Sequence, residues 1–139
     1  MTRFRTLLIV LLAGAWTPVP VWAGPEVLEE VPVAKVWAGH PVGFCLLTDA
    51  PRQYVAFYDA DRWMTVGMRT LGDKGWTLAR LPERVGWDSH NSLTLVLDDA
   101  GHLHLCGNMH VDPLVYYRTT VPGDVTSFQR IHRMVCPNE

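Results

Sequence analysis

The sequence predicts an all-β fold, because three features of the chain favour strands over helices. Beyond Gly24 the chain consists of short apolar and β-branched runs without a long helical periodicity. Turn residues separate these runs, as in Asp49-Ala50-Pro51 and Pro122-Gly123-Asp124. The runs also fall into two groups of four. We therefore predict eight strands, at residues 41–48, 53–58, 63–70, 76–80, 92–97, 102–107, 114–119 and 127–131.

An internal repeat relates the two groups. A shift of 49 positions places Met68-Arg69-Thr70 on Tyr117-Arg118-Thr119 and preserves the rhythm of strands and turns. A four-stranded unit of about 40 to 50 residues is typical of a β-propeller blade. The sequence therefore predicts two blades, at about 33–84 and 85–135. An eight-stranded sandwich is the alternative that composition alone favours about equally.

Two blades are too few to close a propeller, which typically needs about four to eight. A blade buries its faces against its neighbours, so two blades leave two apolar faces open. We interpret residues 24–139 as part of an incomplete propeller that is inactive alone. Self-association through the open blade faces is a further expectation.

The N-terminus has the pattern of a secretory signal peptide at residues 1–23. Two arginines precede the apolar run from Thr6 to Trp16, and Val21-Trp22-Ala23 offers a small-residue cleavage site before Gly24. The run is too short for a membrane span, which needs roughly twenty residues. We expect a secreted or periplasmic protein without a membrane anchor. The alternative is a buried helix at the start of a cytosolic domain.

Charge and cysteine content limit the binding partners and the disulfide bonds that the chain can have. The formal net charge is −2 and there is no basic run, which argues against nucleic acid as a partner. The cysteines are Cys45, Cys106 and Cys136, an odd number, so at least one is unpaired within the chain. The pairing stays open, with buried thiols favoured for Cys45 and Cys106.

Two polar segments are the strongest candidates for a site. Gly86-Trp87-Asp88-Ser89-His90-Asn91-Ser92 and Gly107-Asn108-Met109-His110 both lie where a loop meets a strand of the second group. Loops on a rigid scaffold are where binding residues concentrate. The alternative is a turn in which Asp88 or Asn91 caps the backbone and His90 is solvated.

These segments resemble the BNR-repeat propeller family. The resemblance rests on residues 37–44, 54–62, 86–91, 98–102, 107–110 and 116–119 and extends over about 33–135. That family includes seven-bladed lyases that act on uronic-acid polymers such as ulvan, related glycosidases, and many uncharacterised proteins. The resemblance implies that His90 and His110 are catalytic residues in the substrate groove, with Asn91 as a hydrogen-bonding neighbour. His90 would act in proton transfer, and His110 in proton transfer or in binding the uronate.

The reaction that the resemblance implies suits histidine. β-Elimination removes the proton beside a uronate carboxylate and protonates the departing glycosidic oxygen, and imidazole does both near neutral pH. The lyases also use a Tyr and an Arg on later blades, for which Tyr117 and Arg118 are the nearer candidates here, although blade packing is the more favoured role for both. Trp87 is a candidate for sugar stacking.

Other histidines have structural interpretations. His102, His104 and Cys106 share one strand face, which makes a metal site conceivable, but a mixed blade strand is favoured because no fourth ligand is evident. We therefore predict no metal and no cofactor. His40 is expected to be structural or at the groove rim, and His132 receives no role.

The predicted function is a uronate-polysaccharide lyase-like segment that acts on an acidic polysaccharide. A glycoside hydrolase of the same fold and a non-catalytic carbohydrate-binding propeller are the alternatives. Product analysis separates the first two, since hydrolysis leaves no unsaturated sugar.

Overall fold

The computed structural model describes residues 24–39 and 41–132. The predicted signal peptide at 1–23, His40, and the end of the chain with Cys136 lie outside the described residues. The chain divides into two compact units, 1–30 and 31–139. The described part of the first, residues 24–30, carries no regular secondary structure, and every strand belongs to the second.

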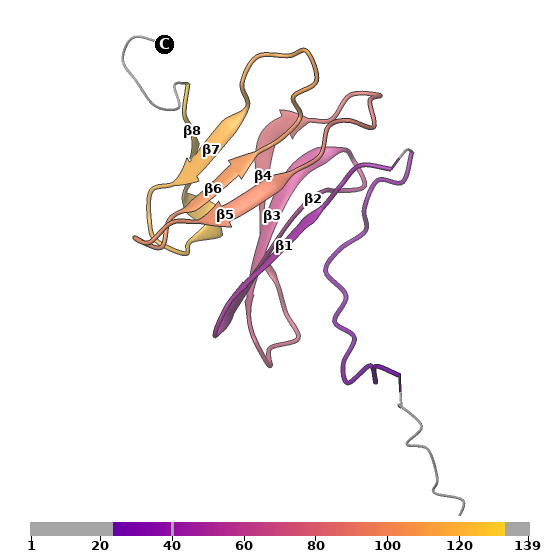
Figure 1. The fold of residues 1–139 in the computed structure, drawn as a ribbon, viewed down its shortest axis with the longest axis vertical. Coiled ribbons are helices and arrows are strands. Elements are labelled where there is room, and N and C mark those ends of the chain that lie inside the picture. The colour runs from indigo at the N-terminus through magenta and orange to yellow at the C-terminus, as the bar shows by residue number, and fades with distance from the viewer. Residues whose placement is uncertain (1–23, 40, 133–139) are drawn as a thin grey trace, which may run out of the picture. The chain divides into compact units, whose positions relative to one another are not determined.

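Two four-stranded antiparallel sheets form the second unit (Figure 1). In each sheet the strands follow the order of the chain, so every strand pairs with its sequence neighbour. The first sheet contains β1 (Cys45–Asp49), β2 (Arg52–Tyr58), β3 (Trp63–Thr70) and β4 (Thr77–Arg84). The second contains β5 (Thr94–Leu97), β6 (Leu103–Cys106), β7 (Tyr116–Thr119) and β8 (Phe128–Arg130), with a 3₁₀ turn, η1 (Val125–Ser127), before β8.

The all-β prediction is confirmed, and each predicted strand overlaps an observed one. The 49-residue shift moves the start of β1 onto Thr94, the first residue of β5, and it also carries β2, β3 and β4 onto β6, β7 and β8. No α-helix occurs among the described residues, so none of them lies in a helix that is long and apolar enough to cross a membrane.

The first strand begins later than predicted, at Cys45 instead of Pro41. At the end of β2, the Trp37 amide donates to the Tyr58 carbonyl at 3.3 Å, and Val36 forms a bridge with Asp59. Residues 36–37 therefore occupy the edge of β2 that an earlier start of β1 would need. This single bridge is a tertiary contact without a local signal in the sequence.

The core lies between the two sheets. Side chains alternate between the faces of a strand, so Tyr54, Ala56 and Tyr58 of β2 lie on the face that packs against Leu95 of β5 and Leu105 of β6. Burying each such leucine stabilises the fold by roughly 1.5–3 kcal/mol. The leucine-rich alternation of β5 and β6 is therefore what holds the second sheet on the first.

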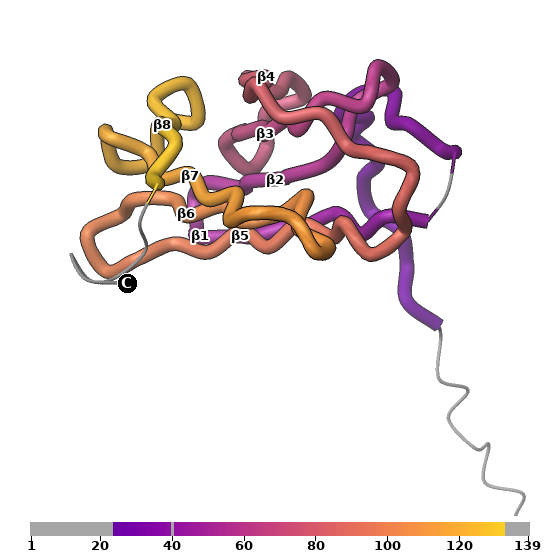
Figure 2. The backbone as a smooth tube through the Cα atoms, turned by 90° about the horizontal axis from the view of Figure 1, so that it is seen from above, coloured from indigo at the N-terminus to yellow at the C-terminus, as the bar shows by residue number. Residues whose placement is uncertain are grey.

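The two sheets pack so that corresponding edge strands lie on the same side of the unit. β1 packs beside β5, and η1 packs against β3 and β4. Figure 2 shows β1 and β5 near one another at one side of the unit and β4 and β8 at the other. Matching strands of the repeat therefore lie on matching edges.

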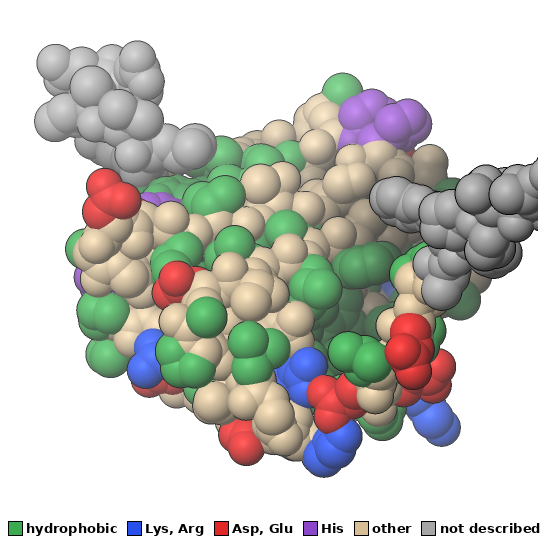
Figure 3. Space-filling model, turned by 60° about the horizontal axis from the view of Figure 1, so that its bottom comes forward, with side chains coloured by type: hydrophobic (Ala, Val, Ile, Leu, Met, Phe, Trp, Pro, Cys, Tyr) green, Lys and Arg blue, Asp and Glu red, His purple; other side chains and the backbone are tan. Residues whose placement is uncertain are grey.

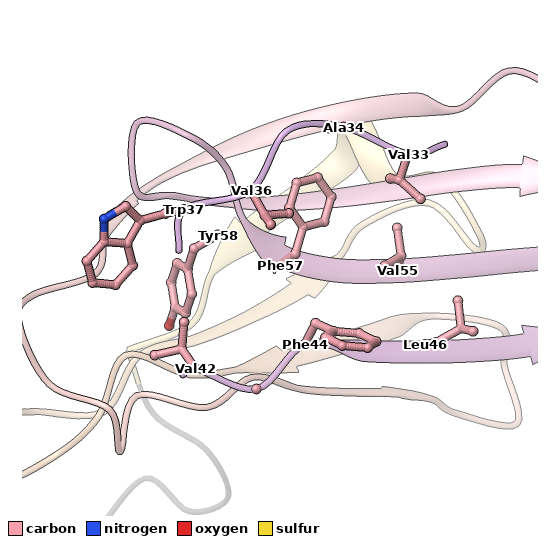
Figure 4. Close-up of a pocket in the computed structure, with 11 residues that line it drawn as sticks. Val33, Ala34, Val36, Trp37, Val42, Phe44, Leu46, Val55, Phe57 and Tyr58 are labelled. Atoms are coloured by element: carbon pink, nitrogen blue, oxygen red, sulfur yellow. The ribbon is translucent and has the colours of Figure 1, made fainter. Parts of the chain in front are cut away.

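The outer face of the first sheet is partly covered by the chain before β1. Val55 and Phe57 point to this face and are buried beneath residues 33–37. An apolar groove of about 370 Å³ remains, with Val33 and Val36 on one side and Phe44 and Leu46 on the other (Figure 4). Phe44 is 72% exposed, so this face is apolar and only partly covered.

Candidate functional site

The two polar segments of the second sheet come together at one end of it. The first precedes β5, and the second follows β6 and precedes β7. In an antiparallel meander, the start of one strand, the end of the next and the start of the third lie at the same end of the sheet. The topology therefore brings residues 86–91 and 107–115 side by side, as the neighbouring loops of Figure 1 show.

Asp88 joins the two segments through its two carboxylate oxygens. Its Oδ1 accepts hydrogen bonds from the His90 amide at 2.8 Å and from the Nδ1 of the same residue at 2.6 Å. Its Oδ2 accepts a bond from Nδ1 of His110. The two imidazole rings lie 4.3 Å apart between centroids, tilted by 41°. One carboxylate thus holds two histidines that are twenty positions apart in the chain.

These hydrogen bonds keep Asp88 ionised. The bond from His110 is the largest cause that lowers the pKa of the Asp88 carboxyl far below its ordinary value of 3.8, followed by the bonds from the amide and the ring of His90. A carboxylate that accepts three hydrogen bonds in this way is ionised at neutral pH. It therefore orients both rings by charge as well as by geometry.

The orientation of the rings leaves the other nitrogen of each available. Both Nδ1 atoms face Asp88, and neither Nε2 hydrogen-bonds to a described residue. A neutral imidazole that donates through Nδ1 carries its lone pair on Nε2. The side chains of His90 and His110 are 69% and 43% exposed, so a ligand can reach both.

The same three residues have donor atoms suited to a divalent metal. One ligand atom from each of Asp88, His90 and His110 lies within 4.8 Å of the others, the one such cluster among residues 24–39 and 41–132. Two imidazoles and a carboxylate are a donor set that suits Zn²⁺. Bound there, the ion would use the imidazole lone pairs that proton transfer also needs.

Trp87 projects into solvent next to this cluster. Trp87 is 76% exposed, and its ring meets that of Trp37 edge-on, with centroids 5.4 Å apart and planes at 79°. The guanidinium carbon of Arg62 lies 5.5 Å from the centroid of the Trp87 ring. Neither Trp37 nor Arg62 was among the predicted site residues, because both precede Trp87 by more than twenty positions.

Asn91 turns away from solvent instead of extending the polar surface. It is 4% exposed, and its Oδ1 finds no hydrogen-bond partner among the described residues. The buried position follows from the strand pattern, since Asn91, Leu93 and Leu95 alternate inward at the start of the second sheet.

The structure does not bring Tyr117 and Arg118 to the histidine pair. Tyr117 is 2% exposed in the core, and its hydroxyl donates to Glu83 at 3.2 Å. Arg118 pairs with Asp98 at 3.1 Å, at the opposite end of β5 from the loop that carries His90. Strand alternation explains both positions, because adjacent residues of β7 face opposite sides.

The histidines of β6 have structural partners. Nδ1 of His102 bonds to the Thr119 carbonyl at 2.8 Å, while His104 bonds through Nδ1 to the Tyr116 hydroxyl at 2.6 Å and through Nε2 to Asp98 at 2.9 Å. Within the described part of the chain, these residues and Cys106 do not form a metal-binding cluster. Cys45 and Cys106 are free thiols, and burial raises the pKa of Cys106.

Fold and site together define an all-β repeat protein that carries an exposed imidazole pair at the end of one sheet. Residues 52–139 match the sequence model of the BNR repeat-containing family. The match spans more than half of the chain, including both loops of the site, and the chain belongs to this family. No curated protein matches the sequence.

Proposed function

We propose that this chain is part of an exported carbohydrate-active propeller that resembles uronate-polysaccharide lyases. The observation that carries the proposal is the histidine pair. Two exposed imidazoles, oriented by one carboxylate, have ring centroids 4.3 Å apart, and the Nε2 of each makes no hydrogen bond to a described residue. Elimination requires two such groups, because one group must take a proton while another gives one.

The reaction balances with these two groups. One imidazole takes the proton from the carbon beside the uronate carboxylate, and the electron pair of that C–H bond forms the new carbon–carbon double bond. The glycosidic C–O bond breaks, and the second imidazole, in its protonated form, gives its proton to the departing oxygen. The geometry assigns neither role to a particular ring. Asp88 acts as a positioning residue, because it fixes both rings through Nδ1.

The propeller interpretation is supported by the packing of the sheets. Each sheet is a four-stranded meander, and β1 lies beside β5 as the inner strands of adjacent blades do. We take the first sheet and the second sheet as two blades of an incomplete propeller. Tyr117 and Arg118 are occupied by Glu83 and Asp98, so neither is placed to assist the histidines, and we expect no turnover by this chain alone.

The test begins with binding and product analysis. The full chain is expected to bind a glucuronate polymer in isothermal titration calorimetry, and His90→Ala and His110→Ala to weaken that binding. His132→Ala removes an exposed histidine elsewhere and is the matched control. Absence of binding by the parent chain would contradict the proposal.

Incubation with the polymer tests the expectation of inactivity. The chain alone is expected to produce no ultraviolet absorbance of unsaturated uronate. Clear formation of unsaturated product would show that two sheets suffice for elimination. Release of reducing sugar without that absorbance would identify a glycoside hydrolase instead, and binding without any product is the outcome expected of a non-catalytic carbohydrate-binding propeller.

Self-association is proposed on the apolar groove of the first sheet. Val36, Phe44 and Leu46 are 57%, 72% and 55% exposed around it, and Figure 3 shows hydrophobic side chains reaching the surface among polar ones. A second copy of the chain is the occupant that needs no further component. Sedimentation equilibrium is expected to show concentration-dependent dimers that Phe44→Asp weakens, and a monomer at all concentrations would overturn this.

We also propose that the protein is exported, because residues 1–23 have the sequence pattern of a signal peptide. Terminal sequencing of protein recovered from the periplasm or the medium is expected to begin at Gly24. Recovery of the uncleaved chain from the cytosol alone would contradict it.

A further inference from the structure

Trp87 and Trp37 form a right-angled aromatic corner beside the histidine pair. Trp87 immediately precedes Asp88, so its backbone is fixed by the same loop that holds both imidazoles. Its partner is fixed independently, since the Trp37 amide donates to Tyr58 and its ring packs on Gly39, where an added Cβ would lie 2.3 Å from a ring carbon. An indole that is 76% exposed yet held in place is suited to contact a ligand.

Arg62 completes this corner, and its backbone is unusual. Its φ of 73° lies in the left-handed region, which is uncommon for a residue with a side chain and is often found at functional positions. Asp59 stabilises this turn. Its carbonyl accepts from the Arg62 amide at 2.8 Å, and its Oδ1 accepts from the Asp61 and Trp63 amides at 2.9 and 3.0 Å. These bonds therefore fix the backbone of Arg62.

The charge of Arg62 is not balanced by a neighbouring acid. Arg80 pairs with Asp59, Arg118 with Asp98, and Arg130 with Glu83. For Arg62, by contrast, no carboxylate within residues 24–39 and 41–132 lies within ion-pair distance. Its side chain makes one hydrogen bond, from NH1 to the Val85 carbonyl at 3.3 Å.

A half-buried guanidinium with unused donors is a site for an anion. Guanidinium has five N–H groups in a planar fork that matches a carboxylate. The aromatic face beside it favours a ligand with a flat apolar surface of C–H groups, such as a sugar ring. A carboxylate and a C–H face occur together in a uronate residue, whereas a neutral sugar would leave the guanidinium without an anionic partner.

We infer that Arg62, Trp87 and Trp37 form a subsite for one uronate residue of the polymer. The sugar ring stacks on Trp87 and its carboxylate bonds to Arg62, so that the neighbouring linkage lies toward Asp88 and the two histidines. This inference rests on the proposed function and names the residues that select the acidic sugar. Trp37 is a positioning residue, since it supports Trp87 edge-on.

The experiment compares two ligands that differ only in the carboxylate. Cello-oligosaccharide and its C6-oxidised counterpart, cellouronate of equal length, are titrated into the full chain by calorimetry. The parent is expected to prefer cellouronate by about tenfold, the usual size of one charge-assisted hydrogen-bonding contact. Arg62→Gln should remove this preference while the affinity for the neutral ligand is unchanged. Trp87→Ala should weaken both ligands by about tenfold.

Matched variants control for the loss of a similar group elsewhere. Arg84 lies over Trp63, with its guanidinium carbon 5.7 Å from the ring centroid, so Arg84→Gln removes the same kind of contact. Val121→Ala removes an exposed apolar side chain on another loop. Both controls should bind cellouronate within about twofold of the parent, and circular dichroism with thermal unfolding should show that every variant is folded.

The outcomes separate the two proposals. If the parent prefers cellouronate and neither Arg62→Gln nor Trp87→Ala changes its binding, the subsite is wrong and the proposed function stands. If Arg62→Gln keeps the preference, Arg62 is not the carboxylate partner and the inference is overturned. Binding of neither ligand by the folded parent would overturn the proposed function, and the subsite with it.

Discussion

Asp88 and Asp98 lie at opposite ends of β5, and each holds a histidine in the same chemical way. Hydrogen bonds from imidazole are the largest cause that lowers the pKa of each carboxyl, from His110 at Asp88 and from His104 at Asp98. Both histidines contact an oxygen of their aspartate through a ring nitrogen. The aspartate–histidine contact is therefore of the same kind in the two clusters, although Asp98 also pairs with Arg118.

The difference lies in the second ring nitrogen. His104 uses both nitrogens, one for Asp98 and one for the Tyr116 hydroxyl, and its side chain is 24% exposed. His90 and His110 use Nδ1 alone, and both are more exposed. An imidazole with both nitrogens engaged tightens a fold, whereas one with a free nitrogen can bind or transfer a proton. The contact with an aspartate therefore does not distinguish the two clusters, whereas the unused Nε2 of His90 and His110 leaves those rings able to bind a ligand or transfer a proton.

Acylation by diethyl pyrocarbonate is the largest expected contrast between the clusters. The reagent attacks an unprotonated ring nitrogen, so His90 and His110 should react about tenfold faster or more than His104, whose nitrogens are both hydrogen-bonded. Peptide mapping by mass spectrometry at several times measures the three rates. Equal rates at His104 and His90 would remove the basis of the comparison.

Replacement of one aspartate at a time should separate the clusters. Asp88→Asn keeps the shape of the side chain but removes the negative charge that favours Nδ1–H on both rings. Nitrogen-15 chemical shifts should show a change of tautomer at His90 and His110 with His104 unaffected, and Asp98→Asn should give the reverse. A change confined to His90 would show that Asp88 does not bridge the two loops.

Thermal stability should respond more to Asp98 than to Asp88. The Asp98 Oδ1 also accepts from the Ala100 and His102 amides, at 3.0 and 2.8 Å, and thereby closes the turn between β5 and β6. Asp98→Ala should lower the melting temperature measured by calorimetry by more than Asp88→Ala does. The opposite order would mean that the loop at 86–91 contributes more to folding than the turn.

Lowering the pH should reduce the stabilisation that both clusters contribute. This is the smallest of the expected effects. The pKa of each carboxyl lies below the ordinary 3.8 in the folded chain. The stabilisation from these contacts is therefore fully present above the unfolded-state value and is lost as the pH falls through the lowered one. Carbon-13 titration of the two carboxyls should give midpoints below 3.8, and an ordinary midpoint at Asp88 would contradict its contacts with His90 and His110.

A zinc titration further tests the difference between the Asp88 cluster and the Asp98 cluster. Because Asp88, His90 and His110 offer three ligand atoms within 4.8 Å, native mass spectrometry tests whether the cluster holds an ion. We expect a zinc adduct, if one forms, to disappear in His110→Ala and to persist in His104→Ala. An adduct that persists in His110→Ala would place the ion elsewhere.

Strand order and repeat length could be predicted from sequence because they depend on local signals. Turn residues such as Asp98 and Gly101 end the runs, and alternation in β5 and β6 assigns the leucines to one face. The later start of β1 could not be predicted, since it depends on Trp37 reaching Tyr58 across twenty-one positions. Distant contacts of this kind leave no periodicity in the chain.

The sequence by itself determined the all-β class, the two groups of four strands and the polar loops that carry His90 and His110. Tertiary structure alone decided which side chains meet. It joined both histidines to Asp88, placed Arg62 and Trp37 beside Trp87, and put Tyr117 in the core. The physical reason is that turn chemistry and alternation act over a few residues, whereas a site is assembled when packed sheets bring separate loops to one edge.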